Sequence, residues 1–297
     1  MELQRYHGNF EKCLAQLAVA KQKQATTKQV MQYRIEQGAD SDACQKGFWG
    51  SENFNVIDGR IYGAVAEFNP LIPYANQAVN AHAKGSEFYL TDKVLLNGKP
   101  ASQVLKEIEK QDSKKPVSKK RVLDLGQAQT HNVPTDSFAD DNGIAFLARN
   151  KTLANQYGLF LKDKAGITQV TFYLPPIQSK DYARGFWLCR LGGSDRSDFN
   201  GDGRSLGDDG GSLFGVRRVK GAEGAQFCNG IQKSIGIAGL QAAQKNSGVE
   251  MKVFPYTEEQ LKSYLETAKG IREGKLGSLQ AGKLEELVLG LKQFLKK

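Results

Sequence analysis

The spacing of apolar and polar residues along the first half of the chain predicts a mixture of helices and short strands. Between Phe10 and Gln37, apolar side chains recur at helical intervals among Lys and Gln, which indicates a helix or a helical pair ending near Gly38. Residues 59–65 and 88–91 are rich in β-branched and aromatic residues, which is typical of strands, and Asn97-Gly98 is a turn signal. Residues 100–109 return to helical spacing.

The second half of the chain continues this mixture. Residues 122–125 and 170–174 predict strands, the latter ended by two prolines. Residues 139–157 predict a helix whose inward side chains are Ile144, Phe146, Leu147 and Leu153. Two short apolar segments, 186–188 and 214–217, are expected to lie together in one small sheet. Their core side chains are Phe186, Trp187, Phe214 and Val216.

Length and charge limit the class of protein. With 297 residues, 40% of them hydrophobic, the chain can bury a proper core. No apolar run approaches a membrane span and the N-terminus lacks the layout of a signal peptide, so we expect no membrane insertion and, by default, a cytoplasmic location. The net charge of +9 is dispersed, and its densest run, residues 114–121, is interpreted as a solvated loop. No nucleic-acid partner is therefore expected.

Catalytic and metal-binding patterns are weak. The four cysteines have no CxxC spacing and no neighbouring histidine, so reduced thiols are expected instead of a zinc or redox site. They are Cys13, Cys44, Cys189 and Cys228. The three histidines are isolated, and the chain has neither a phosphate loop nor a nucleophile elbow. We therefore expect a protein that is not an enzyme and needs no cofactor.

The most informative feature is a gap in residue types between Leu188 and Val219. This segment contains no Lys, Glu, Gln, Trp or Met, although these types form about a quarter of the chain and flank it at Trp187 and Lys220. The genetic code offers a reason. An AAC or AAT codon whose adenines are replaced can encode Asn, Asp, Ser, Gly, Arg and ten other types, but never those five.

With the apolar segments on either side, residues 183–188 and 213–219, the segment resembles the variable region of a diversity-generating retroelement target protein of the archaeal type. The resemblance is firmest over residues 120–220. In that family, adenine-directed reverse transcription rewrites a surface carried on a C-type lectin fold. The resemblance implies an α+β, C-type lectin-like fold with helical terminal extensions. The implied parts are an N-terminal helical extension over residues 1–45, a lectin-like domain over 46–222 with its variable region at about 188–219, and a C-terminal helical extension over 223–297.

The resemblance also implies which residues bind the ligand, an unknown protein or cell-surface ligand. They are polar or small, reachable from an Asn codon and placed between apolar framework positions. The predicted variable residues are Arg190, Gly192, Gly193, Ser194, Asp195, Ser197, Asp198, Asn200, Asp202, Gly203, Ser205, Asp208 and Asp209. Leu191, Phe199 and Leu206 are interpreted as framework, with Phe199 packing inward, and Arg184 and Arg217 as structural pairs that brace the loops.

Two alternatives stay open. Residues 198–209 fit a calcium-loop template, with Asp198, Asn200 and Asp202 at the first, third and fifth positions and Asp209 at the twelfth, although Ser205 replaces the usual apolar anchor. The other alternative is an enzyme related to the formylglycine-generating branch of the lectin-like fold. That enzyme would need an exposed, reactive cysteine pair or a metal.

Overall fold

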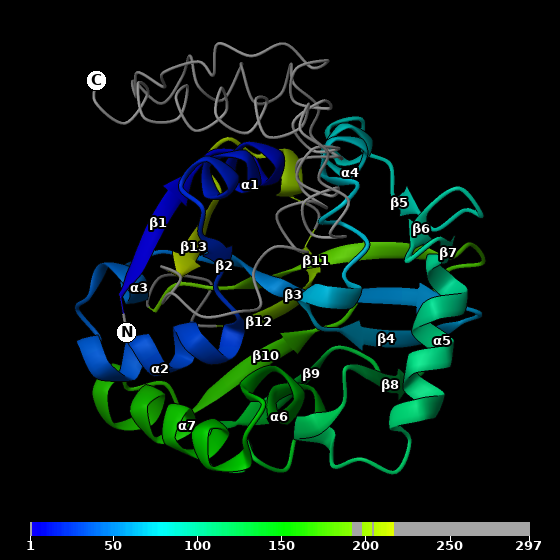
Figure 1. Cartoon of the computed structure of the whole chain (residues 1–297). Coiled ribbons are helices and arrows are strands. Elements are labelled where there is room, and N and C mark those ends of the chain that lie inside the picture. Colours follow the sequence, from blue (N-terminus) through cyan, green and yellow to red (C-terminus); the bar gives the residue numbers. More distant parts are fainter. Residues whose placement is uncertain (1, 192–197, 204, 217–297) are drawn as a thin grey trace, which may run out of the picture. The chain divides into compact units, whose positions relative to one another are not determined.

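The computed structural model describes residues 2–191, 198–203 and 205–216, in which helices and strands alternate (Figure 1). The α-helices are α1 (Phe10–Val19), α2 (Thr27–Gln37), α3 (Asp42–Gln45), α4 (Ala75–Ala83), α5 (Ala101–Asp112), α6 (Asn142–Ala148) and α7 (Lys151–Ala165). The strands are β1 (Leu3–His7), β2 (Lys23–Gln24), β3 (Phe48–Ile57), β4 (Arg60–Ala64), β5 (Phe88–Tyr89), β6 (Leu95–Leu96), β7 (Lys99–Pro100), β8 (Val122–Gly126), β9 (His131–Pro134), β10 (Gln169–Tyr173), β11 (Tyr182–Leu188), β12 (Phe199–Gly203) and β13 (Ser212–Val216). The α+β class predicted from the sequence is confirmed.

The largest sheet of the described chain has eight strands and carries the centre of the fold. Seven of them follow the order β8-β4-β3-β11-β12-β10-β9, and β5 pairs with β11. The pairs along this order are antiparallel except β10 with β12, which is parallel. A second sheet of three strands has the order β1-β13-β2. The short β6-β7 hairpin turns at Asn97 and Gly98, both with positive φ, as the turn signal predicts.

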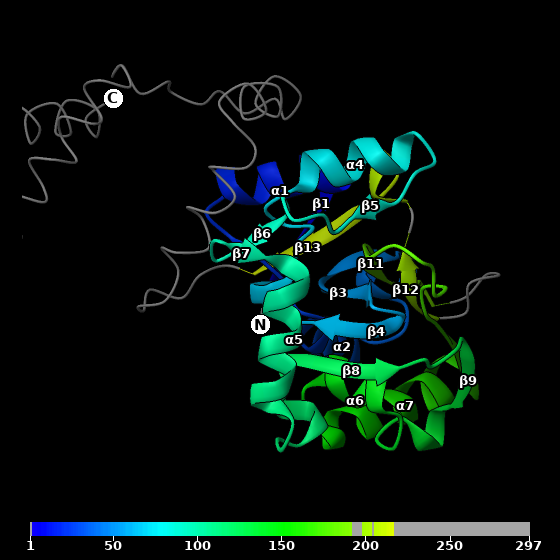
Figure 2. The same ribbon diagram turned by 90° about the vertical axis from the view of Figure 1, so that its right-hand side faces the viewer.

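Each face of the large sheet has its own core. One core joins the sheet to α2, α6 and α7, and the other joins it to α1, α4 and α5. Figures 1 and 2 show α6 and α7 on one side of the sheet, α1 and α4 on the other, and α5 beside β4 and β8. Both faces of β3 are covered, and all ten of its residues are buried. Large apolar side chains buried in this way stabilise the fold by about 1.5–3 kcal/mol each.

Local signals explain where the helices begin and end. The side chain of Asn9 accepts a hydrogen bond from the Lys12 backbone at the start of α1, and Thr26 forms a capping box with Gln29 at the start of α2. The prediction of a helix or a helical pair ending near Gly38 is confirmed, and the structure has two helices there. The predicted helix over residues 139–157 is two helices, because Arg149 adopts a left-handed conformation with φ of 55° between α6 and α7. The four side chains predicted to face inward from it are all buried.

The N-terminal 45 residues differ from the separate helical extension that the sequence predicts. Strand β1 pairs with β13 from Leu3 opposite Val216 to His7 opposite Ser212, and β2 pairs with the same strand. The expectation that segments 186–188 and 214–217 share one sheet is also wrong, because β13 pairs with β1 and β2 and not with β11. The first lies on β11 in the large sheet, whereas β13 is the centre of the three-stranded sheet. The predicted boundary at residues 222 and 223 lies outside the described residues.

The basic run at residues 114–121 follows α5 and is partly paired with acidic side chains. Arg121 donates from Nε and Nη2 to the Asp112 carboxylate at 3.0 and 2.9 Å, and Lys115 lies 2.7 Å from it. Lys120 lies 3.6 Å from Glu109. The bonds from Arg121 hold the pKa of Asp112 well below its usual range. Across the described parts of the chain, no helix combines the length and apolar character needed to span a membrane.

Candidate functional site

The segment from Leu188 to Val219 enters the structure at the end of β11 and reaches the last described strand, β13. Between them lie β12 and a short 3-10 helix, η4 (Ser205–Gly207). Five predicted variable residues lie outside the described residues, and so does the predicted brace Arg217: the five are Gly192, Gly193, Ser194, Asp195 and Ser197. For Ser205, only the backbone is described. The description below therefore concerns residues 188–191, 198–203 and 206–216.

The apolar residues of the segment form its inner layer. Phe199 is fully buried, and its ring lies 5.7 Å from that of Phe138 and 6.1 Å from that of Phe172. Leu191 and Leu206 are also buried. The prediction that these three are framework, with Phe199 packing inward, is confirmed. Of the four predicted core residues on the flanking strands, Phe186 and Phe214 are buried, whereas Trp187 and Val216 are half-buried.

The start of the segment is fixed by residues outside it. The fully buried guanidinium of Arg34 on α2 donates from Nη2 to the Cys189 carbonyl at 2.9 Å and from Nε to the Ala43 carbonyl at 2.8 Å. The Leu191 backbone donates to the Cys44 carbonyl at 2.6 Å. Because a buried cation must find acceptors, Arg34 fixes the relative positions of α2, the loop around α3 and the end of β11.

The middle of the segment is fixed by Arg184, which the sequence identifies as a brace. Its guanidinium is fully buried on β11 and pairs with two carboxylates, Glu87 before β5 and Asp202 on β12. The bond from Nε to Glu87 Oε2 is 2.9 Å. An unpaired charge at this depth would cost several kcal/mol, so both partners serve the fold. Asp202 is thus a predicted variable residue with a structural role.

Two other predicted variable residues have less freedom to change than Asp202, because no second group replaces their contacts. Asp198 is only 9% exposed, and its Oδ1 accepts a hydrogen bond from the Thr171 backbone at 2.7 Å. Gly203 is buried in the pairing of β12 with β11, where a Cβ would lie 2.5 Å from the Gly185 carbonyl oxygen. No side chain fits there without a shift of the backbone.

The remaining predicted residues are more accessible. Arg190, Asp208 and Asp209 are exposed. Asn200 is half-buried on β12, where it pairs in register with Trp187 on one side and with Tyr173 on the other. Tyr173 is 38% exposed, which makes it an accessible aromatic neighbour that lies outside the segment and that the sequence did not identify.

The described residues do not form the predicted calcium loop. Residues 199–203 are a strand, Asp198 accepts from the Thr171 backbone and Asp202 pairs with Arg184, so their oxygens do not converge. Nowhere in residues 2–191, 198–203 and 205–216 do three His, Cys, Asp or Glu side chains gather as a metal site. This geometry differs from the alternative because β12 continues the large sheet and ordinary strand pairing replaces the tight turn of a calcium loop.

Two cysteine side chains bear on the enzyme alternative. Burial raises the pKa of Cys13 to about 12 and raises the pKa of Cys44 above its ordinary value. The Cys13 thiol donates to the carbonyls of Tyr6 and Gly8. Since the thiolate is the reactive form, burial disfavours the reactive form of both side chains.

Sequence reasoning missed Arg34, Glu87 and Tyr173. Each acts through partners far along the chain: Glu87 is 97 positions from Arg184, and Arg34 is 155 positions from Cys189. A local pattern does not contain such pairs. The sequence held a usable signal only for Tyr173. Successive side chains of a strand point to opposite faces, so an inward Phe172 in the predicted strand places Tyr173 outward.

Comparisons with known proteins add one likeness. No family model matches this sequence, and a search of curated proteins found no match. The structure is similar to a solved chain described as showing accommodation of massive sequence variation in Nanoarchaeota by the C-type lectin fold. The likeness has a TM-score of 0.48 and 11% sequence identity, and covers 73% of this chain and 97% of that one. The C-type lectin fold named for that protein is the fold that the sequence predicts for this chain.

Proposed function

We propose that this chain is a non-enzymatic binding protein whose ligand-binding surface lies in residues 188–219 and is varied by a diversity-generating retroelement of the archaeal type. In this proposal a C-type lectin-like fold carries the variable surface. The ligand is a protein, free or on a cell surface. It is bound by short polar side chains displayed on a fixed scaffold, as antibody loops bind antigens.

The observation that carries the proposal is the gap in residue types between Trp187 and Lys220. Calcium binding or catalysis would not exclude Lys, Glu, Gln, Trp and Met together from such a segment, whereas editing of Asn codons excludes all five. The anchoring of the segment supports this reading. Arg34 and Arg184 donate to Cys189 and Asp202, and the Leu191 backbone donates to Cys44. All three partners lie outside the segment and would stay constant.

The structure sharpens which positions are expected to vary. Arg190, Asp208 and Asp209 are exposed and Asn200 is half-buried, and the hydrogen bonds accepted by the Asn200 and Asp208 side chains come from Asp202 and Gly210 within the segment. Gly203 is expected to stay constant, because any other residue brings a Cβ against the Gly185 carbonyl. Asp198 is expected to vary little, because its carboxylate accepts a hydrogen bond from the Thr171 backbone N–H, which would otherwise lose its partner.

The decisive experiment is DNA sequencing of the gene and its neighbourhood. We expect an adenine-rich near-copy of the codons for residues 188–219 beside a reverse transcriptase gene, with mismatches confined to template adenines. Among copies from different cells, changes should fall at codons 190, 200, 208 and 209 and spare codon 203. A neighbourhood without such a copy, or mismatches spread over all four bases, would overturn the proposal.

A further inference from the structure

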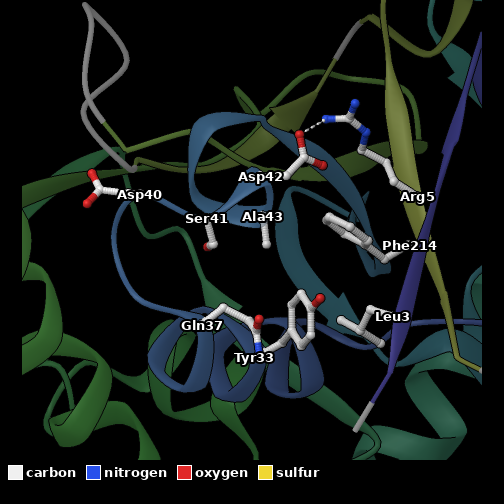
Figure 3. Close-up of a pocket in the computed structure, with 9 residues that line it drawn as sticks. All are labelled: Leu3, Arg5, Tyr33, Gln37, Asp40, Ser41, Asp42, Ala43 and Phe214. Carbon is white, nitrogen blue, oxygen red and sulfur yellow. Dashed lines mark hydrogen bonds and ion pairs between the residues drawn. The ribbon is translucent and has the colours of Figure 1, made fainter.

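A cavity outside the large sheet lies between α2, the loop leading into α3, and the strands β1 and β13. Its volume is about 500 Å³, within the range of small-ligand sites. Figure 3 shows Leu3, Tyr33 and Phe214 on one side and Ser41 and Ala43 on the other. The remaining lining residues are Arg5, Gln37, Asp40 and Asp42.

The cavity is lined by apolar and aromatic residues together with a larger polar part. Leu3, Ala43 and Phe214 are buried, and Tyr33 is half-buried. The rings of Tyr33 and Phe214 lie 6.5 Å apart and are tilted by 55°, and Phe214 is held from behind by Phe48 with a centroid distance of 5.2 Å. Such walls favour an aromatic guest, because a ring placed there finds the edges and faces of two others.

The charges around the cavity are already balanced or turned away. Arg5 donates from Nη1 to Asp42 Oδ1 at 2.8 Å, which neutralises both groups. The carboxylate of Asp40 points away from the other lining residues (Figure 3). The remaining polar groups of the lining are neutral: they are the hydroxyls of Tyr33 and Ser41 and the amide of Gln37. The cavity therefore suits an uncharged guest with one hydrogen-bonding atom.

We propose that this cavity binds a neutral aromatic group that carries a hydrogen-bonding atom, a phenol or an indole, supplied by a Tyr or Trp side chain of a protein ligand. The ring would pack against the cavity faces of Tyr33 and Phe214, and its polar atom would meet the Tyr33 hydroxyl. Aromatic anchors of this kind carry much of the binding energy of protein interfaces.

The position of the cavity supports a protein ligand as the source of that group. Phe214 belongs to the proposed binding segment. Ala43 precedes Cys44, whose carbonyl accepts a hydrogen bond from the Leu191 backbone N–H at 2.6 Å. The cavity thus adjoins the segment at both ends, while Leu3, Tyr33 and Ala43 lie outside it and would be identical in every variant. Only the choice of a protein as partner rests on the proposed function. The anchor would give a diversified surface one constant contact.

The test uses side-chain analogues and the full chain. Backbone amide shifts are followed by NMR during titration with p-cresol, with toluene as the analogue that lacks the hydroxyl, and with n-butylammonium as a cation. We expect p-cresol to shift the amides of Leu3, Ala43 and Phe214 saturably. Toluene should bind there roughly threefold to tenfold more weakly, as expected for one missing hydrogen bond. Butylammonium should leave these amides unmoved.

Two conservative variants identify the group that recognises the hydroxyl. Tyr33→Phe should lower the affinity for p-cresol to that for toluene and leave toluene unchanged. Tyr89→Phe, a half-buried tyrosine on β5, is the matched control and should change neither. Equal affinities for p-cresol and toluene in the native chain, tighter binding of butylammonium, or no saturable shift at the three amides would overturn the proposal. Binding of p-cresol beside a gene that has no template copy would uphold the cavity and reject the retroelement.

Discussion

The buried carboxylate of Asp112 and the buried guanidinium of Arg184 each gather partners of opposite charge, but they draw them from different parts of the chain. The partners of Asp112, Arg121 and Lys115, belong to the loop between α5 and β8, which is constant in the proposed function. Arg184 has one partner in the constant chain, Glu87, and one in the proposed variable segment, Asp202. Both centres have no exposed side-chain surface.

This difference shows how a scaffold can tolerate change on one side of a buried charge. If Asp202 were replaced by a neutral residue, Arg184 would keep Glu87 and remain neutralised. If Asp112 were replaced, Arg121 and Lys115 would lose their shared partner, but their side chains are 34% and 46% exposed and can turn to water. The Arg184 cluster is thus protected by a second anion, and the Asp112 cluster by solvent. Four substitutions test this comparison.

The largest effect is expected from Arg184→Met, which leaves Glu87 and Asp202 without their buried cation. Removing one partner of a buried ion cluster costs about 3–5 kcal/mol. Urea unfolding followed by circular dichroism measures the loss. A loss below about 1 kcal/mol would mean that the two carboxylates reach water and that Arg184 is no brace.

Asp112→Asn is expected to cost less, about 2–3 kcal/mol, because charge-assisted hydrogen bonds are lost while the cations can be solvated. The substitution also changes the dependence of stability on pH. The folded pKa of Asp112 lies well below its unfolded value of about 3.9. Its contribution is therefore present above pH 4 and is lost as the pH falls through that value toward the folded pKa.

The pH dependence separates this carboxylate from the others. Unfolding free energies of the native chain and of Asp112→Asn, measured between pH 5 and pH 2.5, should converge as the pH falls. Asp92→Asn, at an exposed aspartate that forms no ion pair with another described residue, is the control and should run parallel to the native chain. A constant difference between the native chain and Asp112→Asn would show that Asp112 does not lose its charge-dependent contribution in this range.

The third test compares the two partners of Arg184 directly. Glu87→Gln should cost about 2 kcal/mol, because both carboxylate oxygens of Glu87 accept hydrogen bonds from Arg184 and Glu87 is only 13% exposed. Asp202→Asn should cost under about 1 kcal/mol, since Asp202 is 30% exposed and Glu87 remains. Urea unfolding of both variants ranks them. The reverse order would mean that the segment supplies the stronger anchor and cannot vary at residue 202.

The sequence predicted the elements that depend on local spacing and missed the pairings that depend on distant residues. The helices α1, α2 and α5 and the buried faces of α6 and α7 follow from periodicity, because a helix repeats its contacts every three or four residues. The pairing of Leu3 with Val216 has no such basis, since strands of two to five residues carry too short a pattern. The N-terminal residues were therefore separated from the domain to which they belong.

The candidate site shows the same division. The inward position of Phe199 and the brace at Arg184 were predicted, because an apolar residue among Gly and Asp, and a charge beside an apolar strand, stand out locally. The roles of Asp198 and Gly203 were not predicted. By composition, both residues look like products of an edited codon. The position of β12 between β10 and β11 shows that Asp198 accepts a hydrogen bond from a backbone amide and that Gly203 leaves no room for a side chain.

The smallest effect per residue is expected at the exposed positions of the segment. Replacing Arg190, Asp208 and Asp209 together by serine should change the free energy of unfolding by no more than about 0.5 kcal/mol for each residue, because exposed side chains contribute little to stability. The melting temperatures of the triple variant and of Gly203→Ser are compared by thermal unfolding. Gly203→Ser places a Cβ 2.5 Å from the Gly185 carbonyl oxygen and should lower the melting temperature clearly. Both variants introduce serine, which an edited Asn codon can encode, so the two variants differ only in where the serine lies. A triple variant as unstable as Gly203→Ser would show that the exposed residues also serve the fold, and the separation of scaffold from binding surface would fail.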